Sequence, residues 1–145
     1  MEDNRFEALK LENQLSFPLY ACSREIIKRY KPFLDRIDMT YTQYISMLVL
    51  WEHHSMTARE LGEKLLLDSG TLTPLLKKLE SKGMITRRRS DKDERNLIVT
   101  ITDAGEALKD EALKVHDAMH ANCPLCKEEA EQLGSILHKI MEMDA

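Results

Sequence analysis

The fold is decided by the stretch from residue 68 to residue 101, which reads DSGTLTPLLKKLESKGMITRRRSDKDERNLIVTI. Its first half is rich in leucine and lysine and ends at Gly83, a residue type that commonly terminates helices. Its second half holds two β-prone runs, 84–89 and 97–101, on either side of the polar residues 90–96. The stretch therefore predicts a helix followed by a β-hairpin with a long charged loop.

The start of this helix stays open between two local rules. Asp68 can cap it, whereas Pro74 in the first helical position would favour a start at Thr73. Two helices are expected before it, one running to about His53 and the other to about Leu67. Each opens on a capping box, Thr40 with Gln43 and Thr57 with Glu60.

Two helices joined by a short turn and followed by a basic hairpin form a winged helix-turn-helix. We therefore predict a mainly α fold with a small β-hairpin. In this arrangement the second helix of the pair enters the major groove, about 12 Å wide, and the hairpin reaches phosphates or the minor groove.

Helices are also expected at both ends of the chain. Apolar residues at helical spacing predict a first helix to about Tyr30, broken by Lys31-Pro32, with Pro18 marking either a kink or a start nearby. Thr102 caps a helix that runs to about Met119 before Cys123-Pro124 breaks it. A last helix follows. The apolar positions of the first and last helices are Leu11, Leu15, Leu19, Ile26 and Tyr30, then Leu133, Ile136, Leu137, Ile140 and Met141.

Composition indicates one globular domain with an uneven charge distribution. The chain has 145 residues, 43% of them hydrophobic and 32% charged, and a formal net charge of −4. Residues 77–95 hold eight Lys or Arg and four Asp or Glu, so this window carries +4 and the rest carries −8. A basic island on an acidic protein suggests a surface that binds a polyanion, although a solvated charged hairpin would look the same.

The sequence also bears on compartment and chemistry. We expect no membrane span and no signal peptide, and three cysteines suggest a reducing cytoplasm. No phosphate loop, dinucleotide fingerprint or nucleophile–base set is present, so we expect neither an enzyme nor a bound cofactor.

Residues 68–80 and 87–95 together resemble the core of the MarR family of transcriptional regulators. Residues 11–20 (LENQLSFPLY) and 40–44 (TYTQY) resemble its OhrR branch, the organic-hydroperoxide-sensing repressors. The resemblance covers most of the chain from about Leu11 to Thr102 and weakens over the last forty or so residues.

This resemblance implies a homodimeric, DNA-binding regulator, with two winged domains on successive half-sites of a pseudo-palindromic operator. It divides the single chain 1–145 into a DNA-binding region at about 37–102 and a helical dimerisation region at about 7–36 and 103–145. The implied DNA-binding residues are Ser69, Gly70, Thr71, Thr73, Lys77 and Lys78 on the helix, and Arg87, Arg88, Arg89 and Arg95 on the wing. Arg95 would be the wing-tip side chain that enters the minor groove.

One departure from the resemblance concerns the redox sensor. The position of the branch's peroxide-reactive cysteine is occupied by Ser16, while the surrounding tyrosines correspond to Tyr20, Tyr30 and Tyr41. A serine hydroxyl is far less acidic than a thiol and cannot form a sulfenic acid. An engineered Cys-to-Ser change and a natural relative that senses differently, or not at all, both stay open, as does a plain helix-capping role for Ser16.

The late histidines and cysteines allow several interpretations. His116, His120, Cys123 and Cys126 have a spacing that could supply four zinc ligands, although it is not a standard zinc-finger pattern. Cys123 or Cys126 could instead be a secondary redox thiol, with Cys126 and Glu129 as a capping box, or both could be ordinary loop residues. Cys22 is expected to be buried. A regulator that responds to a small aromatic ligand or to a metal is the alternative to a peroxide-responsive one.

Overall fold

The computed structural model describes residues 4–143 as a mainly helical chain with one small sheet. Its elements are η1 (Asn4–Leu9), η2 (Leu11–Asn13), α1 (Ser16–Asp35), α2 (Tyr41–His53), β1 (Ser55–Thr57), α3 (Ala58–Leu65), α4 (Ser69–Ser81), β2 (Ile85–Arg89), β3 (Leu97–Ile101), α5 (Asp103–Ala107), α6 (Lys109–Ala121) and α7 (Lys127–Met141). The predicted winged helix-turn-helix is confirmed, with α3 and α4 as the helix pair and β2–β3 as the wing.

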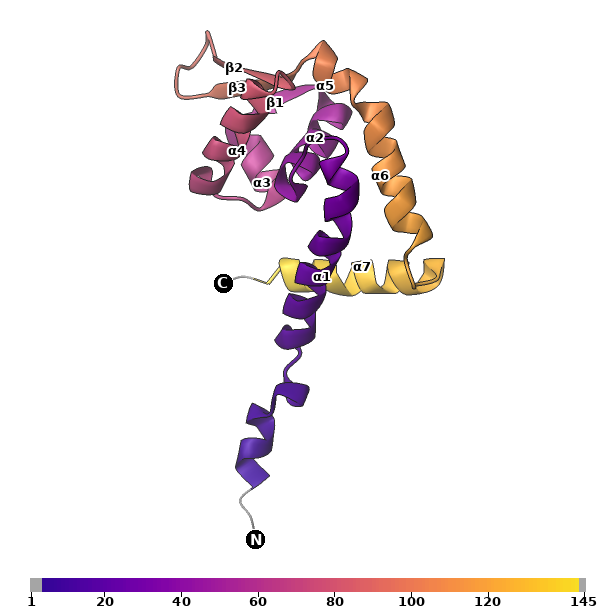
Figure 1. The fold of residues 1–145 in the computed structure, drawn as a ribbon. Coiled ribbons are helices and arrows are strands. Elements are labelled where there is room, and N and C mark those ends of the chain that lie inside the picture. The colour runs from indigo at the N-terminus through magenta and orange to yellow at the C-terminus, as the bar shows by residue number, and fades with distance from the viewer. Residues whose placement is uncertain (1–3, 144–145) are drawn as a thin grey trace.

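Figure 1 shows a head made of α2, α3, α4 and the three strands. Helix α1 rises into this head from the N-terminal side, and α6 descends from it on the other side. At the foot of α6 the chain turns sharply into α7, while η1 and η2 extend away from the head. None of the described helices is long and apolar enough to cross a membrane.

The helix starts follow the local hydrogen-bonding rules. The Thr40 hydroxyl accepts the amide N–H of Gln43 at 3.3 Å, and the Gln43 side chain accepts the amide N–H of Thr40 at 3.1 Å, which completes the predicted capping box. The box at Thr57 and Glu60 is also formed. Helix α4 begins after Asp68, so of the two starts left open the Asp68 cap holds and Pro74 lies inside the helix.

The sheet has one strand more than the sequence indicated. The wing strands pair antiparallel as predicted, with Thr86 opposite Thr100, but β1 pairs on the other side of β3, so the order is β1-β3-β2. The extra strand lies directly before the Thr57 cap. It ties the start of α3 to the root of the wing, because Met56 is opposite Val99.

The core lies between α2, the helix pair and the sheet. Its fully buried side chains come from α2, α3, α4, β2 and β3 and from the end of α1, which makes these elements a single packing unit. They include Leu34, Met47, Leu50, Leu61, Leu76, Leu79, Ile85 and Val99. Trp51 adds a buried polar link, because its Nε1–H donates to the carbonyl oxygen of Gly105 at 2.9 Å.

Two expectations for the end helices were wrong. Lys31-Pro32 does not break the first helix, which runs on to Asp35, because Leu34 in its last turn is 2% exposed and packs into the core. Burial of that turn outweighs the one backbone hydrogen bond that a proline removes. The helix predicted from Thr102 to Met119 is divided at Leu108 into α5 and α6.

Candidate nucleic-acid interface

Helix α4 presents one polar face and one buried face. Its four leucines, Leu72, Leu75, Leu76 and Leu79, are buried in the core. All six residues that the resemblance assigns to DNA contact on this helix, Ser69, Gly70, Thr71, Thr73, Lys77 and Lys78, are exposed. The core therefore holds α4 so that small hydroxyl side chains lead at its N-terminal end and two lysines follow, the arrangement of a helix that reads a groove.

Asp68 fixes the N-terminal end of this face. One carboxylate oxygen accepts the amide N–H of Thr71 at 2.7 Å, and this hydrogen bond lowers the pKa of Asp68. The carboxylate is therefore engaged with the helix backbone. It acts as a cap, as the sequence suggested.

The wing carries its cations unevenly. Arg88 and Arg89 are exposed on β2, and Arg95 lies at the turn of the wing with a side chain 91% exposed. The Nε atom of Arg95 lies 3.2 Å from Asp93 Oδ1, and the Arg95 amide donates to the same oxygen at 3.0 Å, so this carboxylate pairs with one edge of the guanidinium group. The rest of the Arg95 side chain is open to solvent at the turn of the wing.

Arg87 has a different environment from the other wing arginines. Its side chain is 18% exposed, and Nη2 donates to Glu80 Oε1 at 3.0 Å. The other Glu80 oxygen accepts the amide N–H of Arg87, also at 3.0 Å. The hydrogen bond from Arg87 is the largest cause of the lowered pKa of Glu80. Arg87 thus joins the wing to α4, which is a supporting position for the interface.

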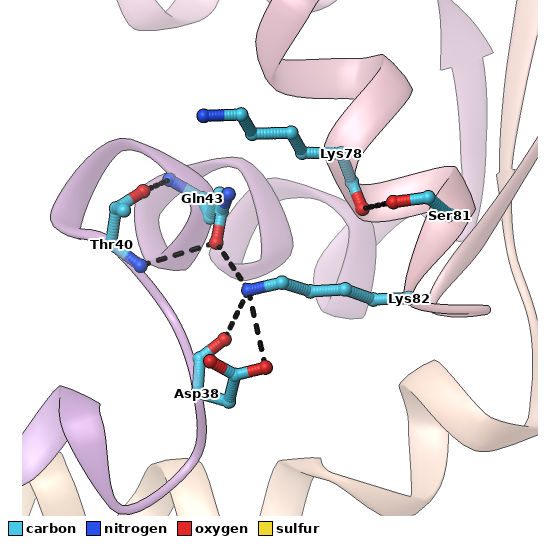
Figure 2. A network of polar contacts seen from close by, with 6 residues as sticks. All are labelled: Asp38, Thr40, Gln43, Lys78, Ser81 and Lys82. Atoms are coloured by element: carbon cyan, nitrogen blue, oxygen red, sulfur yellow. Dashed lines mark hydrogen bonds and ion pairs between the residues drawn. The ribbon is translucent and has the colours of Figure 1, made fainter.

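Lys82 also lies away from the polar face of α4. Its ammonium group donates to Gln43 Oε1 at 3.1 Å and to the backbone carbonyl of Asp38, and it lies 3.6 Å from Asp38 Oδ2 (Figure 2). In Figure 2 no drawn contact reaches the ammonium group of Lys78, one turn earlier in α4, and only its backbone carbonyl is bound, by the Ser81 hydroxyl at 2.8 Å. Lys82 belongs to the basic island of residues 77–95, but its side chain anchors the end of α4 to the α1–α2 connection.

The predicted sensor residues are divided within one chain. Tyr30 and Tyr41 meet with ring centroids 5.1 Å apart, and Tyr44, which the sequence did not single out, lies 5.8 Å from Tyr30. Burial, with Tyr41 as a smaller cause, raises the pKa of Tyr30. Ser16 is at the opposite end of α1, about 20 Å away along a helix that rises ~1.5 Å per residue.

The other predicted sensor residues also stand apart from this cluster. Tyr20 is exposed and lies under the guanidinium of Arg24. The capping role considered for Ser16 is wrong, because the N-cap of α1 is Leu15 and it makes no side-chain cap hydrogen bond. Cys22 is exposed, which contradicts its expected burial, because α1 enters the core only near its C-terminal end.

The late cysteines and histidines form no metal centre in the part of the chain that the structure describes. His116 and His120 stack with ring centroids 6.1 Å apart, and no group of three or more potential ligands is placed to hold a metal ion among residues 4–143. Cys126 caps α7 as predicted, with its amide N–H donating to Glu129 Oε2 at 3.0 Å.

Comparison with known proteins places this geometry in a family. The family described as transcriptional regulator SarA/Rot matches residues 28–112, more than half of the chain. The organic hydroperoxide resistance transcriptional regulator of Bacillus subtilis is 46% identical over 97% of this chain and 95% of its own length. The regulator SarZ of Staphylococcus aureus is 48% identical over 68% of this chain and 67% of its own.

A solved structure agrees with these sequence matches. The structure of reduced AbfR bound to DNA superposes with a TM-score of 0.82 at 33% identity, covering 94% of this chain and 93% of that one. The resemblance recognised in residues 11–20 and 68–95 is thus confirmed over nearly the whole chain. The chain belongs to the MarR-type transcriptional regulators, in the branch that includes the organic hydroperoxide resistance regulators and the SarA/Rot proteins.

Proposed function

We propose that this regulator is a repressor that binds a pseudo-palindromic operator as a homodimer in the cytoplasm. The observation that carries the proposal is the polar face of α4, where every residue expected to contact DNA is exposed opposite four buried leucines. Among the described residues, Lys77 and Lys78 have no ion-pair partner, so both are available to phosphates. In the operator complex α4 lies in the major groove and Arg95 enters the minor groove.

A second copy of the chain would complete the helical regions at both ends. Helix α7 has no buried residue, and Ile136 on its apolar face is 55% exposed. Leu15 and Phe17, at the start of α1, are exposed as well. Apolar surface of this extent on the terminal helices is typical of an association face. We assign about 7–36 and 103–145 to dimerisation and about 37–102 to DNA binding.

The dimer can be tested directly by sedimentation velocity. The native chain should sediment as a dimer at micromolar concentration, and Ile136→Glu should shift it toward monomer, because a carboxylate would have to be buried at the interface. Ser135→Glu, which changes a neighbouring exposed residue, should leave the dimer intact. A native chain that sediments as a monomer would contradict the assignment.

The residues expected to form the sensor pocket can meet only in a dimer. Because α1 separates Ser16 from the Tyr30–Tyr41–Tyr44 cluster within one chain, a pocket holding all of them requires a second copy. With Ser16 in place of a thiol, this pocket would have no group to oxidise. The fold could thus place a thiol at residue 16 for peroxide sensing, but the serine now at this position cannot react with peroxide.

DNA binding can be tested without knowing the operator. Selection from a random pool of DNA duplexes should enrich an inverted repeat whose half-sites are spaced by about one helical turn or a multiple of it. The double variant Lys77→Ala, Lys78→Ala should bind the selected duplex more weakly. The slope of its log K against log salt should fall by the amount expected for about two lost phosphate contacts. Enrichment of no sequence, or equal binding by the double variant, would count against the proposed function.

A further inference from the structure

The corner between α6 and α7 holds two thiols that the regulator's DNA-reading head does not use. Helix α6 ends at Ala121 and α7 begins at Lys127, and between them lie Cys123 and Cys126, separated by Pro124 and Leu125. Both cysteines are exposed, and neither is in a disulfide. We propose that Cys123 and Cys126 form a redox-active dithiol that closes to an intrachain disulfide when it reacts with an organic hydroperoxide.

The backbone at the corner suits this bond. Neither cysteine belongs to a helix or strand, and the chain bends at Leu125, between them. The local hydrogen bonds are those of a turn and a helix cap: the Cys123 amide donates to the His120 carbonyl at 3.1 Å, Cys126 forms a capping box with Glu129, and the Cys126 carbonyl accepts the Ala130 amide at 3.0 Å. A disulfide needs Cα atoms about 4.4 to 6.8 Å apart, a separation that two intervening residues allow across a bend.

The two cysteines have the C-x-x-C spacing found in many redox-active dithiols. Because both side chains are exposed, closing the bond would displace no core side chain and open no cavity. Cys22 is also exposed, but it lies within α1 and has no second cysteine near it in the sequence. It therefore serves as the internal control.

The reaction needs only the two thiols and the hydroperoxide. The sulfur of one cysteine, as its thiolate, attacks the terminal oxygen of the hydroperoxide, the O–O bond breaks, and the alcohol leaves with a proton. The resulting sulfenic acid is then attacked by the second thiolate, which forms the S–S bond and releases water. In total, two thiols are oxidised to one disulfide, and one hydroperoxide is reduced to an alcohol and water.

The position of the dithiol gives it a consequence for regulation, which rests on the proposed function. The corner sets the direction in which α7 leaves α6, and α7 carries the apolar face that we assign to the dimer. A disulfide between Cys123 and Cys126 would fix this corner in one conformation. The two copies of the head would then be held at a different spacing from that of the reduced dimer.

Intact mass spectrometry of the full-length chain tests the dithiol. After treatment with a modest excess of cumene hydroperoxide, the chain should lose about 2 Da, as expected for one disulfide. Peptide mapping should place the bond between Cys123 and Cys126, and dithiothreitol should reverse it. Cys22→Ser should behave like the native chain, whereas Cys123→Ser and Cys126→Ser should each fail to lose this mass.

Two results would overturn the proposal. One is a covalent dimer on a non-reducing gel in place of the intrachain bond. The other is a native chain whose mass rises by added oxygen, or does not change, in place of the loss of about 2 Da expected for a disulfide. Circular dichroism of the serine variants guards against an unfolded control. None of these measurements uses DNA, so they remain decisive even if the operator proposal fails.

The regulatory consequence has its own measurement. Reduced and oxidised native chains are compared on the selected duplex by fluorescence anisotropy, with Cys123→Ser treated identically. Oxidation should weaken binding by the native chain about tenfold or more and leave Cys123→Ser unchanged, since typical allosteric couplings are of this size. Equal affinities of the disulfide-bonded and reduced native chains would overturn the regulatory step.

Discussion

The ammonium group of Lys82 donates a 3.1 Å hydrogen bond to Gln43 Oε1, and this contact joins the end of α4 to the start of α2 (Figure 2). Gln43 is 2% exposed, and the same oxygen also accepts the amide N–H of Thr40. Lys82 additionally binds the carbonyl of Asp38, a residue with a left-handed backbone conformation at φ 51°. One lysine therefore connects the α1–α2 loop, the α2 cap and the recognition helix.

This arrangement predicts that Lys82→Met weakens DNA binding by misplacing α4, without removing a phosphate contact. The variant keeps most of the apolar stem but loses the ammonium, so unfolding free energy should fall by about 1 kcal/mol. The slope of log K against log salt should stay native. Lys78→Met is the matched control and should lower that slope by about one contact. Equal slope losses in the two variants would place Lys82 on the DNA.

Arg95 at the wing tip should contribute strongly to operator affinity. Its side chain is 91% exposed, against 18% for Arg87, and a cation at this tip suits a narrow, electronegative minor groove. Arg95→Ala should weaken operator binding by about 1 to 3 kcal/mol in a gel-shift titration. Lys127→Ala, which removes a similarly exposed cation from α7, should change affinity little. If Arg95→Ala stayed within about twofold of native, the wing assignment would fail.

Alanine substitutions at Gly105 and Gly134 should change the free energy of unfolding in opposite directions. A Cβ on buried Gly105 would clash with the carbonyl oxygen of Met84 and lie 2.7 Å from Ile101 Cγ1, whereas a Cβ on Gly134 in α7 would meet nothing within 4 Å. Gly105→Ala should lower the unfolding free energy by about 1 to 3 kcal/mol through overpacking. Gly134→Ala should raise it by up to about 1 kcal/mol, because alanine favours the helix. Chemical denaturation of the two variants measures both effects, and a neutral Gly105→Ala would refute the close packing of α5.

The cap of α4 should make stability depend on acid pH. The hydrogen bond from the Thr71 amide lowers the pKa of Asp68 in the folded chain, so its stabilisation is present above the unfolded-state pKa of about 3.9. It is lost as the pH falls through the lower, folded-state pKa. Relative to Asp68→Asn, which cannot titrate, the native chain should therefore lose stability as the pH falls from about 5 to about 3 and below. Thermal denaturation across this range provides the comparison, and a constant difference between the two proteins would rule out the linkage.

The parts of the fold that were predictable from sequence depend on neighbours along the chain. The capping boxes at Thr40 and Thr57, the turn at Gly83 and the wing strands are all fixed by residues a few positions apart. Strand β1 was missed because a three-residue strand has little pattern of its own, and it exists through pairing with β3 some forty residues later. The run of α1 past Pro32 was missed for the same reason, since it depends on the burial of Leu34 in a core made by other helices.

The candidate interface shows the same division. The pattern of α4 predicted which of its faces is polar, but a charge count cannot say where a long side chain points. Arg87 and Lys82 both belong to the basic window, yet one binds Glu80 and the other binds Asp38 and Gln43. These acceptors lie on other elements: Glu80 on α4, Gln43 on α2 and Asp38 in the connection between α1 and α2. Only the folded chain separates these anchoring cations from those that face outward.

Residue 16 can be tested by itself in a chain from which Cys123 and Cys126 have been removed. In the variant Cys123→Ser, Cys126→Ser, the chain should hold the selected duplex in the presence of cumene hydroperoxide, because Ser16 cannot be oxidised and Cys22 is turned about 120° around α1 from it. Adding Ser16→Cys should create peroxide-induced release. The Tyr30 phenol is protonated at neutral pH, so it can donate a hydrogen bond to a sulfur brought near it by a second copy. Anisotropy before and after peroxide measures the release, and dithiothreitol should reverse it if the product is a sulfenic acid or disulfide.

Release by the background variant with Ser16 intact would mean that Cys22 or another group is the sensor. No release after Ser16→Cys would mean that the tyrosine cluster and residue 16 do not form one pocket.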